Sequence, residues 1–84
     1  MKTHQLKCDN EPFHAVWDGR KRAEYRNNNR QFEVADKLIL VDSTEESRRI
    51  ACIITHIQTG YGIPDGYAML SFIVDDRYVL KSNN

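Results

Sequence analysis

The pattern of apolar residues allows this chain one short helix near its start and only β-strands after it. Phe13, Val16 and Trp17 stand at positions i, i+3 and i+4, so they share one face of a helix. Later apolar runs are short, rich in β-branched and aromatic residues, and bounded by turn residues. We therefore expect a helix over residues 11–18, strands over residues 2–8, 22–27, 37–41, 48–58 and 67–74, and a further short strand within "RYVLKSNN", residues 77–84.

This order of elements predicts the α+β fold class. Strands that follow one another without helices between them pair mainly antiparallel. A small sheet protects its edges by curling, so we expect a small curled β-barrel of mainly antiparallel strands with one N-terminal helix. The 84 residues are enough for one domain, which we place over residues 1–84.

The cysteines and the N-terminus bear on location. Cys8 and Cys52 lack the C-x-x-C spacing of a redox or metal motif, so we expect two buried free thiols in a reducing compartment. Residues 1–8 hold no apolar signal core, and no apolar run reaches the length of a membrane span. These features predict a cytoplasmic protein without membrane contact. The three histidines show no metal-ligand spacing, so we expect no metal and no cofactor.

Positive charge is concentrated in one stretch of an otherwise neutral chain. The protein has 12 basic and 12 acidic residues, so any electrostatic binding surface must be local. The stretch "GRKRAEYRNNNR", Gly19–Arg30, contains five basic residues and one acid, Glu24. It is a solvated edge, a phosphate-binding surface or part of a catalytic pocket.

Strand alternation divides this stretch into two faces. It places Ala23 and Tyr25 on one face and Glu24 and Arg26 on the other, and we expect Tyr25 to face the core. Glu24 is then a natural partner for Arg26 or Lys21. The two bases could contact phosphate, or the cluster could be a surface ion pair worth about 0–1 kcal/mol.

Four segments share their order and spacing with a known family. They are "HQLKC", "PFHAVWDGRKRAEYR", "FEVADKLIL" and "GIPDGYAMLSF", and the second holds the pattern G-x-K-x-x-E-x-R. Together they resemble the ASCH domain, the activating-signal-cointegrator homology domain of the PUA-like superfamily. The likeness is strongest to a small bacterial and phage subgroup carried as a domain of unknown function. One departure is Ala35, where the family pattern has glycine.

The resemblance implies a PUA-like barrel with a cleft that binds RNA or a nucleotide. The motif residues Lys21, Glu24 and Arg26 would lie in this cleft. Arg20, Arg22 and Arg30 lie outside the motif and could widen a phosphate-binding rim, and of these we count Arg22 among the ligand-binding candidates. Bases stack on aromatic side chains, so Tyr61, in a glycine-containing loop, is a further ligand-binding candidate.

Two other classes of function stay open. Some PUA-like relatives are N4-acetylcytidine amidohydrolases, whose catalytic set is a Lys, a Thr three residues later and a distant Glu. Lys21 matches the first, Glu24 stands at the Thr position, and no glutamate follows Glu46. Some ASCH relatives are also reported as ribonucleases, so the substrate of a hydrolase could be a modified nucleoside or RNA. Lys21 and Glu24 would be the catalytic residues of such an enzyme, but we expect no hydrolysis of N4-acetylcytidine. The third class is a protein-interaction domain in which the cluster is structural.

Overall fold

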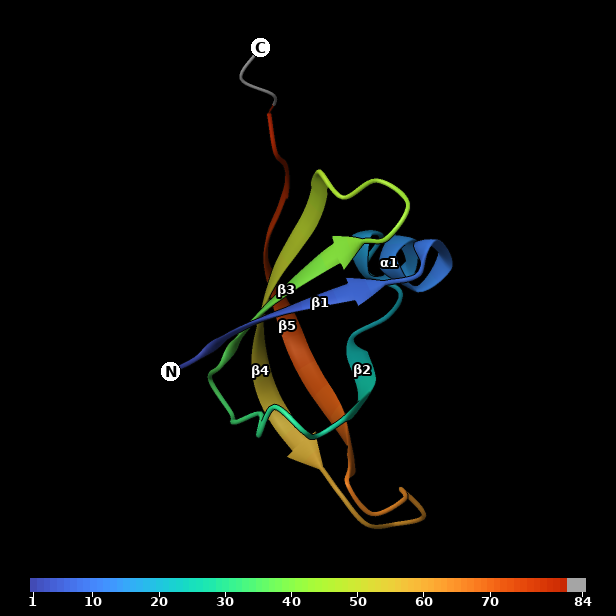
Figure 1. Ribbon diagram of the computed structural model, residues 1–84, viewed down its shortest axis with the longest axis vertical. Helices are drawn as coiled ribbons and strands as arrows, with labels where there is room; N and C mark the ends of the chain where they lie inside the picture. The colour runs from blue at the N-terminus through green and yellow to red at the C-terminus, as the bar shows by residue number, and fades with distance from the viewer. Residues whose placement is uncertain (82–84) are drawn as a thin grey trace.

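The computed structural model describes residues 1–81 and contains one helix and five strands (Figure 1). This arrangement confirms the α+β class and the N-terminal helix. The last strand is longer than expected, because residues 67–74 and the start of "RYVLKSNN" belong to a single strand; residues 82–84 of that segment lie outside the described residues. The elements are β1 (Thr3–Cys8), α1 (Asn10–Trp17), β2 (Ala23–Asn27), β3 (Lys37–Asp42), β4 (Arg48–Gln58) and β5 (Tyr67–Val79).

The five strands form one curled sheet in the order β1-β3-β4-β5-β2. Three of the four pairings are antiparallel, as expected, whereas β1 lies parallel to β3. The parallel pair is possible because α1 and β2 lie between these strands in the chain and provide the crossover. Two irregularities in the β4–β5 ladder, at Ala51/Cys52 and Ile54/His56, increase its bend. The result is a half-barrel whose free edges, β1 and β2, are the two ends of the sheet.

The core fills the concave side of this half-barrel. Alternate residues of β1 point inward, so His4, Leu6 and Cys8 are buried while their neighbours are exposed. In α1, Phe13 and Val16 are fully buried against the same core. Both cysteines are buried and free, which confirms the expectation of two unpaired thiols.

The end of α1 sets the course of the chain into β2. Gly19 has φ of 82°, a left-handed conformation that costs little without a Cβ. The next two backbone N–H groups, of Arg20 and Lys21, both donate to the carbonyl of Ala15, at 2.9 and 3.0 Å. The chain therefore turns sharply at Gly19 and enters β2 beside the end of α1.

A buried carboxylate joins β1 to the turn before β3. Asp36 is fully buried and accepts hydrogen bonds from the Lys2 amide (2.9 Å), His4 Nε2 (2.8 Å) and the Glu33 amide (3.0 Å). Burial alone would raise its pKa, but these hydrogen bonds lower it to about 2. Ala35 beside it has φ of 77°, so the turn keeps a glycine-like geometry with an alanine.

Within residues 1–81, no helix is long and apolar enough to cross a membrane.

Candidate functional site

Arginine side chains, rather than a backbone ladder, bridge the two free edges of the half-barrel. Arg26 of β2 donates from Nη2 to the carbonyl of Lys7 in β1, at 2.8 Å. Arg30, just after β2, donates from Nη1 to the carbonyl of Gln5, also at 2.8 Å. We call this gap between β1 and β2 the seam. The charged stretch noted in the sequence therefore lies along the open side of the fold.

Glu24 is the centre of the charged cluster at the seam. Its side chain is about 10 % exposed, and its two oxygens are divided between the neighbouring bases. Lys21 Nζ lies 3.2 Å from Oε1, and Arg26 Nε donates to Oε2 at 2.8 Å. Lys21 also donates to the carbonyl of Ala23. The structure thus brings together Lys21, Glu24 and Arg26, three of the five predicted ligand-binding residues.

Cys8 completes this cluster from the other side of the seam. Its Sγ lies 3.7 Å from Glu24 Oε2 and 3.6 Å from Arg26 Nη2. Burial, and then the Glu24 carboxylate, raise the pKa of Cys8 to about 11. The thiol is therefore protonated at neutral pH and serves as a weak donor to Glu24 rather than as a nucleophile.

The prediction that Tyr25 faces the core was wrong, although the alternation along β2 was right. Glu24 is the buried residue and Tyr25 is 45 % exposed. The reason is the position of β2 at the edge of a curled sheet, where the inward face meets the polar end of β1 rather than the apolar core. The exposed face of β2 therefore carries an aromatic ring next to the charged cluster.

A hollow of about 310 Å³ opens at the seam, and we call it the seam hollow. This volume is at the lower end of the usual range for small-molecule sites, about 300–1,000 Å³. Arg26 is held here by hydrogen bonds from Nε and Nη2. Its Nη1 has no acceptor among residues 1–81, so the N–H groups of Nη1 are available to donate to a ligand. The hollow is lined by Lys7, Cys8, Asp9, Pro12, Glu24, Tyr25, Arg26 and Asn27.

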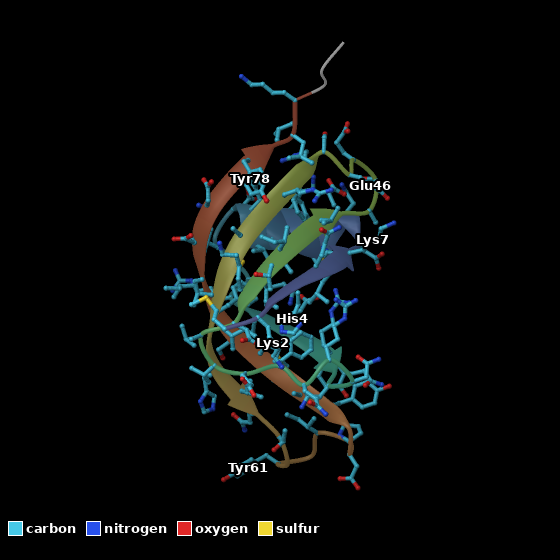
Figure 2. The ribbon with its side chains drawn as sticks, turned by 60° about the vertical axis from the view of Figure 1, so that its left-hand side comes forward. Lys2, His4, Lys7, Glu46, Tyr61 and Tyr78 are labelled. Atoms are coloured by element: carbon cyan, nitrogen blue, oxygen red, sulfur yellow. The ribbon has the colours of Figure 1, made fainter. Side chains whose placement is uncertain are left out.

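The structure does not bring every predicted residue to this hollow. Lys21 contacts Glu24 but, with the exposed Arg22, lines a separate hollow against Phe72 and Arg77. Tyr61 is 94 % exposed at the tip of the β4–β5 hairpin, far from Lys7 (Figure 2). Tyr61 therefore does not belong to the seam hollow.

Sequence reasoning missed two contributors to the site and misassigned a third. The Lys7 carbonyl and the Cys8 thiol belong to β1, and Tyr25 had been assigned to the core. The inward pattern of His4, Leu6 and Cys8 along β1 was a usable signal for Cys8. No group of three or more potential metal ligands occurs among the described residues.

The model of one known protein family matches most of the chain. Residues 3–72 match the family described as "Domain of unknown function (DUF3850)". The chain belongs to the DUF3850 family. The match to DUF3850 extends from the start of β1 into β5, so it includes every residue that lines the seam hollow. No curated protein matches the chain.

Proposed function

We propose that this protein binds single-stranded RNA or a nucleotide in the seam hollow. The observation that carries the proposal is an exposed ring, Tyr25, beside a fixed guanidinium, Arg26, at one hollow. Stacking of a base on an aromatic side chain contributes about 1–3 kcal/mol. An arginine held in one orientation offers N–H groups to a phosphate or to a base edge.

The buried glutamate supports a shaped site rather than a diffuse basic patch. Glu24 and its partners fix Arg26 before any ligand arrives, which lowers the entropic cost of binding. Lys21, Glu24 and Arg26 together carry one net positive charge, which suits a ligand with one phosphate at this point.

The resemblance to the ASCH domain supports the same proposal, since that family has been proposed to bind RNA or nucleotides. We also propose the PUA-like superfamily as the wider group of this fold on that basis. The two free thiols are typical of a reducing compartment, so the proposed location is the cytoplasm, where RNA is available.

The test is a fluorescence-anisotropy titration with a labelled octaribonucleotide. We expect saturable binding that Tyr25→Ala weakens by about 1–3 kcal/mol, because the stacking surface is lost. Tyr61→Ala is the matched control, since it removes the same side chain outside the hollow and should leave the affinity unchanged. Equal affinities for all three proteins would contradict the proposal, because RNA would then bind outside the seam hollow. No binding by any of them would also contradict it and would favour a protein-interaction domain with a structural ion-pair cluster.

A further inference from the structure

Two exposed tyrosines of neighbouring strands stack on each other at the edge of the sheet. The rings of Tyr25 in β2 and Tyr67 in β5 lie 5.4 Å apart between centroids, with only 9° between their planes. Asn27 is the direct partner of Tyr67 in the ladder, so Tyr25 and Tyr67 are diagonal neighbours on one face. They are 45 % and 37 % exposed. A stacked pair this exposed leaves part of each ring accessible to a ligand.

Each tyrosine of the pair lines a different hollow. Tyr25 lines the seam hollow, whereas Tyr67 lines a second hollow of about 200 Å³ formed largely by the β4–β5 loop, which we call the hairpin hollow. Its position is fixed by backbone bonds from the Asn28 amide to the Gly66 carbonyl (2.7 Å) and from the Tyr67 amide to the Pro64 carbonyl (3.1 Å). Each hollow is therefore lined by one member of the stacked pair.

The two hollows differ in charge. The seam hollow contains two bases, Arg26 and Lys7, of which Lys7 is paired with Glu46. It also contains two acids, the already paired Glu24 and the exposed Asp9. Among the residues that line the hairpin hollow, Asp65 is the one charged residue. Asn28, which directly follows β2, supplies the one side-chain amide. A carboxylate repels phosphate but accepts hydrogen bonds from amino and hydroxyl groups. The hairpin hollow thus suits a base or a ribose, and the seam hollow suits a phosphate with its base.

We infer that the ligand is a single-stranded oligonucleotide, of which at least two bases bind on the outer faces of the Tyr25–Tyr67 pair. One base stacks on Tyr25 in the seam hollow, and another base of the same strand stacks on Tyr67 in the hairpin hollow. This inference rests on the proposed function and narrows it, because a free mononucleotide would fill only one of the two hollows.

Chain-length dependence tests the inference, with adenosine monophosphate and the tetranucleotide of adenylate as probes. Each stacked base contributes about 1–3 kcal/mol, so the tetranucleotide should bind the native protein at least about 5-fold more tightly. Tyr67→Leu keeps an apolar side chain against Tyr25 and removes the second ring. It should weaken tetranucleotide binding by about 5-fold or more and leave the mononucleotide affinity unchanged.

Tyr25→Ala should weaken both probes. Tyr61→Ala is the control, because Tyr61 belongs to the β4–β5 loop but lines neither hollow, and it should weaken neither probe. Equal affinity of the native protein for both probes overturns the two-hollow inference and leaves the proposed function standing. An equal loss for both probes in Tyr67→Leu also overturns it, because Tyr67 would then act only by supporting Tyr25. Failure of every probe to bind the native protein overturns the proposed function itself.

Discussion

At the scale of single residues, Glu24 is a negative charge inside a site proposed to bind an anion. Both its oxygens are used, by Lys21 on one side and by Arg26 and Cys8 on the other. In a shaped site this carboxylate stabilises the orientation of Arg26, whereas in a simple basic patch it only reduces the attraction. The two interpretations predict opposite effects on RNA affinity when the charge of Glu24 is removed.

We therefore expect Glu24→Gln to bind RNA more weakly than the native protein. The amide keeps the volume but bonds Arg26 less strongly, and the expected loss is about 1–2 kcal/mol, near the low end for a charged hydrogen bond. Anisotropy titrations at constant salt measure the effect. Glu45→Gln, at an exposed position in the β3–β4 loop, controls for the change in net charge. Tighter binding by Glu24→Gln would support the patch and rule out the shaped site.

Asp36 is expected to make stability depend on pH in the acid range. Its folded-state pKa is about 2, below the ordinary value of 3.8, so the folded protein favours the carboxylate. This stabilisation is complete above about pH 4 and is lost as the pH falls through about 2. Asp36→Asn should lower the free energy of unfolding at neutral pH by about 1–3 kcal/mol, because buried donors lose their acceptor.

Urea unfolding of both proteins between neutral pH and about pH 2 checks this expectation. The difference between native protein and variant should shrink as the pH drops below about 4, while the exposed control Asp76→Asn should show no such trend. A difference that stays constant over the whole range would show that the charge of Asp36 does not stabilise the fold.

At the scale of elements, the turn between α1 and β2 depends on a single glycine. Gly19 has φ of 82°, and a Cβ added there would meet no atom within 4 Å, so backbone strain is the only cost of a side chain. Gly19→Ala should lower the free energy of unfolding by about 1 kcal/mol, after the smaller entropy of the unfolded chain is counted. Gly19→Asn should lose less, because asparagine tolerates this conformation better. Equal stability of Gly19→Ala and native protein in urea would contradict this account.

The type and order of the elements could be read from the sequence, because periodicity and turn residues are local signals. The isoleucine-rich segment gave β4 with the bounds Arg48–Gln58 that the structure has. The parallel pairing of β1 with β3 carried no local signal, since it depends on where α1 returns the chain. The inward face of β2 could not be derived either: alternation separates Glu24 from Tyr25, but only the curl decides which of them is buried.

For the candidate site, too, local sequence signals predicted one part, and the rest depends on the fold. Three motif residues, Lys21, Glu24 and Arg26, were predicted to lie together, and spacing within one turn and one strand was enough for that. Tyr61 was assigned to the same cleft from its glycine-containing loop, but β4 and β5 are long and carry the loop away from the seam (Figure 2). Strand length and sheet curvature therefore decide which aromatic residue lies beside the charged cluster.

At the scale of the whole molecule, we expect no hydrolysis of N4-acetylcytidine. The side chain of Lys21 is engaged by Glu24 and by the Ala23 carbonyl, and the Cys8 thiol is protonated at neutral pH. In the proposed PUA-like resemblance, Glu24 also stands at the position where the N4-acetylcytidine amidohydrolases have threonine. Incubation of the protein with N4-acetylcytidine, followed by chromatography, measures the product. Turnover that disappears in Lys21→Ala would contradict this expectation and identify Lys21 as catalytic.

The final prediction concerns the salt dependence of RNA binding. The chain carries as many acids as bases, so no long-range field adds to the contacts at the seam. Arg26 and Arg30 both line a further hollow along the seam, and Lys7 is already paired with Glu46 at 2.9 Å. About two phosphates can then be neutralised, and each contributes a slope of about −0.7 for single strands. A plot of log K against log salt should have a slope of about −1.4.

Titrations between about 50 and 200 mM salt measure this slope. Arg30→Ala should make it shallower by about 0.7, because one phosphate contact is lost. Arg20→Ala removes an equally charged side chain that is paired with Asp18 and lines neither hollow at the seam, so the slope should not change. A slope steeper than about −3 for the native protein would require four or more neutralised phosphates. That number exceeds what Arg26 and Arg30 can supply, and it would place the ligand on a wider surface than the seam.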